Sequence, residues 1–491
     1  MPESFPSLII RADGYAAQGA FAQAQAEYLD PDPELVARLG QLLRSRNAGV
    51  VAHFYMDAEL QGALWACDWP HIHISDSLVM ADRAVAMAAA GVSEVVVLGV
   101  DFMSENVRAI LDDSGFAQVG CWRVAEEAIG CSLAESAEAL AYGAWLGKAA
   151  ATPNSLHVVY INTSLRTKAR SQHKVPTITC TSSNVVATVL QTFAQEPEAH
   201  VWFGPDTYMG ENLARLFASL AELDDATIRA LHPAHSQTTI KALLPRFHYF
   251  EQGNCIVHHM FGAQVADRVA RDYYASGDVD VTAHLEVPGE MFGVALAASR
   301  EGRGVVGSTK DILDHIVARV DAAIAGSQAQ RLRFVLGTEA GMVTAIVRAI
   351  RLRLAEHAAD ATDHGVEVEI IFPVAAEAVA TTQDQALPII PGVAGGEGCS
   401  AAGGCATCPY MKMNSIDALC DLLERLPMQV ASEAEASAAK LALVRFEPEK
   451  YREMIDGQTV AALGTLPILH MRGFQRSGAL SPELLADMRG R

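Results

Sequence analysis

The chain has 491 residues, of which 50% are hydrophobic, and its formal net charge is −21. This length is enough to bury a large core and predicts about three domains. The acidic balance, with no dense Lys/Arg cluster, argues against nucleic acid or an anionic membrane as a partner, and apolar runs such as 84–92 are too short to span a bilayer.

The N-terminal residues and the cysteines indicate a compartment. Residues 1–8 lack both the basic start and long apolar core of a secretory peptide and the Arg-rich character of a transit peptide. Nine cysteines, an odd number scattered over the chain, do not make a disulfide framework. We therefore expect a cytoplasmic protein whose thiols are available to bind metal.

The first elements in chain order predict an α/β protein. A helix is expected from Asp32-Pro33, with Asp as the cap and Pro at the first helical position. Short β-rich apolar runs then alternate with alanine-rich helical segments, including 77–90, 104–111 and 185–193, which is typical of parallel sheets.

This pattern occurs three times. A first strand ends in two polar side chains at positions i and i+2, which share one face of a strand. The three pairs are His53 and Tyr55, Tyr160 and Asn162, and His284 and Glu286.

A second strand in each repeat ends in small hydroxyl residues just before a helix. The hydroxyls are Ser75 and Ser77, then Thr181, Ser182 and Ser183, and finally Ser308 and Thr309. Such residues cap helices, and the free amides beside them also bind carboxylate or phosphate. A third strand then runs into glycine, at Gly99, Gly204 and Gly337.

One cysteine follows the third strand of each repeat, at Cys131, Cys255 and Cys408. If the three units close around a pseudo-threefold axis with their strand ends inward, the three thiols meet. Three thiolates without a fourth protein ligand suit a [4Fe–4S] cluster with one open iron. The spacing of Cys405 and Cys408 also fits a redox pair, half of a zinc site or a reversible disulfide.

The repeats predict the domain organisation. We expect three pseudo-threefold-related αβα domains with short parallel sheets around a central [4Fe–4S] site. The expected boundaries are 1–145, with a leader helix, then 146–270 and 271–425, followed by a C-terminal helical extension over 426–491 that packs or makes oligomer contacts.

The motifs, in this order over roughly residues 50–425, resemble the quinolinate synthase A family. The segments that carry the resemblance include Ala52-His53-x-Tyr55, Asp76-Ser77-Leu78, Gly99-Val100-x-Phe102-Met103-x-Glu105, Gly130-Cys131-Ser132-Leu133-Ala134, Tyr160-x-Asn162-Thr163-Ser164, Gly337-Thr338-Glu339 and Cys408-Pro409-x-Met411-Lys412-Met413.

The resemblance implies a transferase of NAD biosynthesis that condenses iminoaspartate with dihydroxyacetone phosphate to give quinolinate. An L-aspartate oxidase or dehydrogenase would supply iminoaspartate, and the open iron of a [4Fe–4S] cluster would act as a Lewis acid.

The resemblance also implies a role for each site residue. The cluster ligands would be Cys131, Cys255 and Cys408. Glu286 would be the main acid/base group, with His284, His53 and Tyr160 moving protons. The substrate-binding residues would be Tyr55, Ser77, Asn162, Ser182, Ser308 and Thr309.

The sequence departs from the family pattern at Phe54, Asn254 and Leu285, among other positions, while the polar residues of the motifs are retained. Two other functions fit the cysteines: another [4Fe–4S] hydro-lyase, or a non-catalytic iron–sulfur redox sensor. A sensor does not need His, Tyr and Glu at the strand ends.

Overall fold

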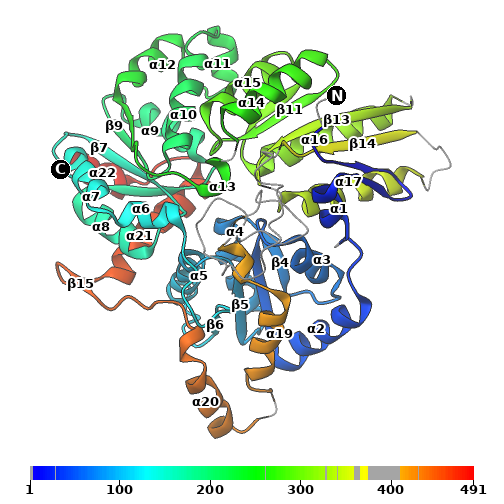
Figure 1. The fold of residues 1–491 in the computed structure, drawn as a ribbon. Coiled ribbons are helices and arrows are strands. Elements are labelled where there is room, and N and C mark those ends of the chain that lie inside the picture. The colour runs from blue at the N-terminus through cyan, green and yellow to red at the C-terminus, as the bar shows by residue number, and fades with distance from the viewer. Residues whose placement is uncertain are drawn as a thin grey trace. The chain divides into compact units, whose positions relative to one another are not determined.

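The computed structural model describes residues 4–27, 29–259, 261–326, 329–339, 341–358, 365–373, 408, 410–429 and 431–491. The chain divides into two compact units, and Figure 1 labels their helices and strands. Unit 1 contains Met1–Val100, Gln118–Ile129 and Ile256–Glu447, and unit 2 contains Asp101–Ala117, Gly130–Cys255 and Pro448–Arg491.

Unit 1 contains two sheets. The first has the strand order β4-β3-β5-β6 and is entirely parallel. The second has the order β12-β11-β13-β14-β1-β2, in which β1 and β2 add antiparallel strands to a parallel set. The strands are β1 (Ser7–Ile10), β2 (Tyr15–Gln18), β3 (Ala48–His53), β4 (Ile72–Ser75), β5 (Glu94–Leu98), β6 (Gly120–Trp122), β11 (Asp280–His284), β12 (Gly304–Gly307), β13 (Gln330–Gly337) and β14 (Val366–Ile371).

The helices of unit 1 pack on these sheets. In the larger sheet, side chains of α1, α16 and α17 form one core with β1, β13 and β14. The helices are α1 (Ala20–Glu27), α2 (Pro33–Arg46), α3 (Ala58–Ala66), α4 (Ser77–Ala89), α13 (Ile256–His259), α14 (Ala263–Asp272), α15 (Gly289–Arg300), α16 (Thr309–Ala325), α17 (Met342–Ala358), α19 (Ile416–Arg425) and α20 (Glu433–Ala442), with the short 3-10 turns η2 (Tyr274–Ser276), η3 (Met411–Met413) and η4 (Val444–Phe446).

Unit 2 contains one four-stranded parallel sheet, in the order β10-β9-β7-β8, and a small hairpin. Its strands are β7 (Ser155–Tyr160), β8 (Thr177–Cys180), β9 (His200–Gly204), β10 (Phe247–Tyr249), β15 (Met454–Ile455) and β16 (Gln458–Thr459). Its helices are α5 (Asp101–Asp113), α6 (Ser132–Glu138), α7 (Leu140–Ala150), α8 (Leu165–Lys174), α9 (Val185–Gln195), α10 (Thr207–Leu220), α11 (Asp225–Leu231), α12 (Gln237–Leu243), α21 (Val460–Ser477) and α22 (Pro482–Gly490), with the 3-10 turn η1 (Leu244–Arg246).

The prediction of an α/β protein with short parallel sheets is confirmed. The sets β4-β3-β5-β6, β8-β7-β9-β10 and β12-β11-β13-β14 share one order, in which the first strand of each set lies between the second and the third. Every residue of the central strands β3, β7 and β11 is buried. This is expected because parallel strands are covered by helices on both faces.

The expected helices are present. Helix α2 begins at Pro33, and the Asp32 carboxylate accepts the backbone N–H of Glu34 at 2.9 Å. Helices α4, α5 and α9 cover the segments expected to be helical. The leader differs from expectation, because residues 7–18 form β1 and β2 and extend the sheet of the third repeat. Within the described part of the chain, no helix is long and apolar enough to cross a membrane.

Candidate active site

The first and second strands of each repeat end side by side. In the sheet register, His53 pairs with Ser75, Tyr160 with Cys180, and His284 with Gly307. The backbone N–H of the following residue then donates to the carbonyl oxygen of that partner, from Phe54 to Ser75 at 3.1 Å, from Ile161 to Cys180 at 2.8 Å and from Leu285 to Gly307 at 3.0 Å. The three repeats therefore build the same backbone junction, where ligand sites of parallel sheets lie.

Two of these junctions orient a histidine in the same way. The Nδ1 atom of His53 accepts the backbone N–H of Tyr55 at 3.2 Å, and Nδ1 of His284 accepts that of Glu286 at 3.3 Å. Because Nδ1 is the acceptor, a neutral ring carries its proton on Nε2. Both imidazoles thus present an N–H donor away from their own backbone.

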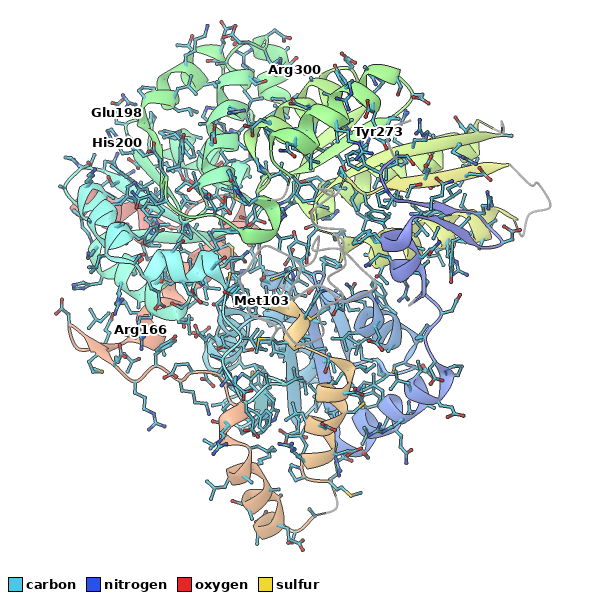
Figure 2. All side chains as sticks on the ribbon, viewed as in Figure 1. Met103, Arg166, Glu198, His200, Tyr273 and Arg300 are labelled. Atoms are coloured by element: carbon cyan, nitrogen blue, oxygen red, sulfur yellow. The ribbon has the colours of Figure 1, made fainter. Side chains whose placement is uncertain are left out.

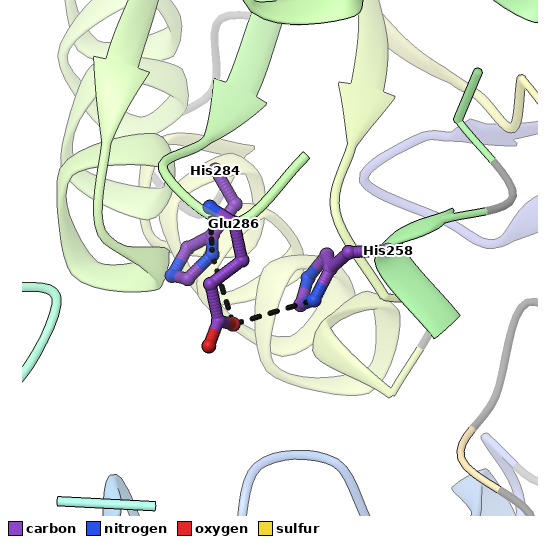
Figure 3. A group of neighbouring side chains, drawn as sticks. All are labelled: His258, His284 and Glu286. Atoms are coloured by element: carbon purple, nitrogen blue, oxygen red, sulfur yellow. Dashed lines mark hydrogen bonds and ion pairs between the residues drawn. The ribbon is translucent and has the colours of Figure 1, made fainter. Parts of the chain in front are cut away.

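A third histidine, His258 of α13, lies beside His284 and Glu286. One carboxylate oxygen of Glu286, Oε2, lies 3.3 Å from Nδ1 of His258 and 3.3 Å from Nδ1 of His284 (Figure 3). The two imidazole rings stack with their centroids 5.2 Å apart. All three side chains are at most 2% exposed, so a carboxylate is held between two imidazoles away from solvent.

Burial controls the protonation of these histidines. It lowers the pKa of both His53 and His258 to about 4, and the positive charge of a protonated His284 lowers both further. The carboxylate of Glu286 opposes this effect for each ring. Both rings are therefore neutral at pH 7 and can donate or accept a proton.

Tyr55 links the first junction to this cluster. Its ring lies edge-on to His53, with centroids 4.7 Å apart, and 6.2 Å from that of His258. Nε2 of His258 and Nε2 of His284 have no hydrogen-bond partner among the described residues. Buried polar atoms without a partner are costly in a folded protein, so these nitrogens suit a bound ligand.

Gly341, two residues after the motif Gly337-Thr338-Glu339, packs against the His53 junction. A Cβ atom on Gly341 would lie 2.8 Å from the carbonyl oxygen of Phe54 and 2.8 Å from Cα of Tyr55. The Gln61 amide donates to the carbonyl oxygens of Phe54, at 2.9 Å, and Gly341, also at 2.9 Å. This close backbone contact requires glycine at position 341.

Glu339 connects the same region to Cys408. The backbone N–H of Cys408 donates to Oε1 of Glu339 at 2.8 Å. Glu339 is fully buried, and burial raises its pKa well above the usual range, while the nearby Lys412 lowers it. The buried Glu339 side chain therefore fixes the backbone of Cys408, the predicted cluster ligand in unit 1.

The hydroxyls of unit 1 lie at helix N-termini. Ser77 is the first residue of α4, after the cap Asp76, and Ser308 caps α16. The Ser308 hydroxyl donates to Oδ2 of Asp311 at 2.7 Å and accepts its backbone N–H at 3.2 Å, so this hydroxyl already serves a capping box. Thr309 is the first residue of α16 and, like Ser77 and Ser308, is buried.

Unit 2 contains the remaining predicted residues. Tyr160 is the buried last residue of β7, and Asn162 is half-buried in the loop that follows. Ser182 is half-buried in the turn before α9, two residues beyond the partner of Tyr160.

Cys131 and Cys255 also belong to unit 2. Cys131 caps α6, and Cys255 is the last residue of its segment. A Cβ atom on Gly253 would lie 2.9 Å from Oγ of Ser136 on α6 and 2.3 Å from the carbonyl oxygen of Pro205. The glycine therefore lets the loop of Cys255 pack tightly against the helix that begins after Cys131.

The cysteines differ in their surroundings. Cys67, Cys131, Cys255 and Cys408 are half-buried, whereas Cys121, Cys180 and Cys420 are buried. Burial raises the pKa of Cys67 to about 11 and that of Cys180 well above its usual range. A metal ligand must be a thiolate, so those two thiols suit packing, and the other three half-buried thiols, on loops and caps, fit an iron–sulfur cluster in number and donor type. Cys399 and Cys405, with the disulfide and zinc alternatives for the latter, lie outside the described residues.

One further group could hold a metal. The ligand atoms of His258, His284 and Glu286 lie within 4.8 Å of one another. Two imidazoles and a carboxylate bind divalent metal ions in many proteins. The same three groups serve equally as a proton-transfer set, because a carboxylate can exchange a proton with a neighbouring imidazole.

Comparison with known protein families identifies the family of this chain. The family model "Quinolinate synthetase A protein" matches residues 37–361. The chain belongs to the quinolinate synthetase A family. That range covers both junction histidines, the His258–Glu286–His284 cluster and two of the three cysteines.

Relatives of the family match almost the whole chain. The chain is 52% identical over 493 residues to "Quinolinate synthase, chloroplastic" of Nicotiana tabacum, 51% over 495 residues to the protein of that name from Arabidopsis thaliana, and 49% over 504 residues to that from Oryza sativa subsp. japonica. Each alignment covers 98% of this chain but only 66%, 67% and 69% of the respective relative. The chain thus spans about two thirds of the length of these relatives.

The expectation of a cytoplasmic protein is wrong. The relatives that match nearly all of this chain are named chloroplastic. The expectation rested on the composition of residues 1–8, and a short stretch of sequence is weak ground for assigning a compartment.

Two residues of this site were missed in the sequence. His258 follows Cys255 by three residues, so its closeness to a predicted cluster ligand was a signal in the sequence. Its contact with Glu286 depends on tertiary structure. Glu339 belongs to a motif that marked the family, yet only the structure places its carboxylate on the backbone of Cys408.

Proposed function

We propose that this chain is a quinolinate synthase, which condenses iminoaspartate with dihydroxyacetone phosphate to give quinolinate, phosphate and water. The observation that carries the proposal is the buried contact of Glu286 with two imidazoles, in a chain of this family. An L-aspartate oxidase or dehydrogenase would supply the unstable iminoaspartate.

Cys131, Cys255 and Cys408 would hold a [4Fe–4S] cluster. When bound, the cluster would supply a Lewis acid, an open iron that polarises a substrate oxygen. The alternative of a non-catalytic sensor leaves the buried acid/base cluster without a role. We also propose three αβα domains, at 1–145, 146–270 and 271–425, related by a pseudo-threefold axis, with the extension 426–491. The common strand order of the three sheets supports three domains, and strands β1 and β2 (residues 7–18) add to the sheet of the third.

The acid/base steps follow from the geometry in unit 1. Condensation and dehydration require protons to be removed from carbon and nitrogen and delivered to a departing oxygen. Glu286 as a carboxylate would accept such a proton and pass it to Nδ1 of His258, 3.3 Å away. His53, neutral at pH 7 and protonated on Nε2, would donate a hydrogen bond to a substrate carbonyl or carboxylate.

Substrate anions would be bound without Lys or Arg. Helices α4, α9 and α16 begin directly after the second strands, and helix N-termini stabilise carboxylate and phosphate groups. Ser77, Ser182 and Thr309 would add hydroxyl donors there, while Tyr55, Tyr160 and Asn162 would bind polar groups of the substrates. Ser308 would contribute chiefly by fixing the first turn of α16, because its hydroxyl is engaged with Asp311.

The test is an anaerobic purification with iron and sulfide counting, followed by an assay with oxaloacetate, ammonia and dihydroxyacetone phosphate. We expect four irons per chain and formation of pyridine dicarboxylate. Replacing Cys131, Cys255 or Cys408 with Ala should abolish both, whereas Cys67→Ala should change neither. A cluster without product would contradict the synthase and favour the hydro-lyase or the sensor.

A further inference from the structure

The loop that joins β7 to α8 carries Asn162 and is tied down by a buried lysine. Lys168, on the first turn of α8, is completely buried, and its Nζ donates to the backbone carbonyl oxygens of Ile161, at 3.1 Å, and Thr163. These two carbonyls flank Asn162 on either side. The lysine therefore fixes the backbone at both neighbours of a residue to which we have assigned substrate binding.

A buried carboxylate holds the other end of the same loop. Glu105 of α5 is 5% exposed, and its Oε2 accepts the backbone N–H of Leu165, the first residue of α8, at 3.0 Å. Its second oxygen, Oε1, accepts the hydroxyl hydrogen of Tyr451 at 2.8 Å. The loop thus has three backbone groups bound by two buried side chains of opposite charge.

The charges of this pair depend on each other. Burial lowers the pKa of Lys168 and raises that of Glu105, and the attraction between the two opposes both effects. Burying two charges costs more than packing apolar side chains of similar size, so a buried pair is weak evidence for added stability. What such a pair can add is conformational specificity, here of the loop.

Tyr451 brings the C-terminal segment into this arrangement. The guanidinium of Arg166, on α8 (Figure 2), lies 4.9 Å from the centre of the Tyr451 ring and pairs with Glu453 at 2.7 Å. Helix α21 packs along α8 so closely that a Cβ atom on Gly464 would lie 2.4 Å from the carbonyl oxygen of Leu165. The segment after residue 447 therefore packs against the start of α8 and holds it in place.

We infer that Glu105, Lys168 and Tyr451 are positioning residues that hold the 161–164 loop, and with it Asn162, in the conformation that binds a polar group of the substrate. The inference rests on the proposed function for the role of Asn162. It gives the extension beyond residue 447 a part in substrate binding, beyond the packing role expected from its sequence.

The test compares Tyr451→Phe with Glu453→Gln in the full-length, cluster-loaded protein. Tyr451→Phe keeps the ring and removes only the hydrogen bond to Glu105, whereas Glu453→Gln weakens an exposed ion pair in the same segment. We expect Tyr451→Phe to raise KM for one substrate by about 3- to 10-fold, the range for one typical intramolecular hydrogen bond, with kcat changed less than about 2-fold. Glu453→Gln should leave both unchanged.

Hydrogen exchange gives a second readout that does not depend on catalysis. Tyr451→Phe should speed exchange of the Leu165 amide, which Glu105 binds, without changing exchange in β7 or the iron content. Unchanged KM and unchanged exchange at Leu165 would overturn the inference, as would an equal effect of Glu453→Gln.

A second variant covers the case in which Tyr451→Phe fails to fold. Glu105→Gln keeps the shape and an acceptor for Tyr451 but removes the charge, and we expect the same rise in KM and faster exchange at Leu165. If the wild-type protein forms no quinolinate, the proposed function fails. Faster exchange at Leu165 would then still show that Glu105 and Tyr451 hold the loop. Unchanged exchange would overturn that part of the inference.

Discussion

Two buried polar clusters of this protein differ in how many of their polar side-chain atoms form hydrogen bonds. In unit 1, Nε2 of His258 and Nε2 of His284 have no hydrogen-bond partner among the described residues. In unit 2, Lys168 binds two carbonyls, and both oxygens of Glu105 accept a hydrogen bond. Buried polar groups are normally satisfied, so the comparison separates a cluster built for a ligand from one built to hold backbone.

This difference predicts opposite effects of mutation. Removing a polar group from the unit 1 cluster should lower catalytic activity but break few hydrogen bonds within the protein. Removing one from the unit 2 cluster leaves its partners buried and unpaired, which lowers the stability of the fold. The following experiments test that contrast, in order of expected size.

Glu286→Gln should have the largest effect, on activity alone. Gln cannot accept and release a proton at neutral pH, so kcat should fall by about 10²- to 10⁴-fold, the usual contribution of a general acid or base. The urea midpoint and iron content should stay near wild type. Glu290→Gln, an exposed position in the first turn of α15, is the matched control. A large loss of stability in Glu286→Gln would place the residue with the structural cluster instead.

Lys168→Met should mainly reduce stability. It leaves the buried carbonyls of Ile161 and Thr163 without their donor, and each unpaired buried polar group costs about 1–3 kcal/mol. Urea unfolding monitored by circular dichroism measures the loss. Lys174→Met, which removes an exposed lysine that also donates to one carbonyl, should cost far less. Equal losses in the two variants would argue against a special role for the buried lysine.

The neutral histidines of unit 1 should make stability depend on pH. His53 has a pKa of about 4 in the folded protein, against about 6.5 in an unfolded chain. Between these values the unfolded state binds more protons, so the free energy of unfolding decreases as pH falls from about 6.5 to 4, by up to about 3 kcal/mol for this group. His53→Gln should therefore lose less stability than wild type between pH 7 and pH 5 in urea unfolding.

The control for this experiment is His71→Gln, a half-buried histidine outside the cluster. If His53→Gln and the wild-type protein lose stability in parallel between pH 7 and pH 5, His53 is not held neutral by burial.

Gly341→Ala should have the smallest effect of the four. An added Cβ would meet backbone atoms of Phe54 and Tyr55 at 2.8 Å, so the junction of His53 must shift, at a cost of about 1–3 kcal/mol. Thermal unfolding and KM should both change. Gly293→Ala on α15, where a Cβ has no neighbour within 4 Å, should leave both near wild type or slightly stabilise the helix. An unchanged KM in Gly341→Ala would show that the junction tolerates movement.

Residues adjacent in the sequence revealed much of the candidate site. The pairs His53 and Tyr55, and His284 and Glu286, lie at strand ends, and the hydroxyls that follow the second strands lie at helix N-termini. These features are local, because a strand fixes the face of residues two apart and a helix start fixes its cap. The leader strands β1 and β2 were missed because they are short and pair with the distant β14.

The α/β class, the threefold recurrence of the strand pattern and the residue types available for chemistry all follow from the order of the residues. The tertiary structure alone decided that His258 contacts Glu286, that Glu339 binds the backbone of Cys408, and that Glu105, Lys168 and Tyr451 meet at one loop. The reason is physical. Periodicity and caps depend on neighbours within a few residues, whereas Glu105 and Tyr451 are 346 positions apart and meet only through packing.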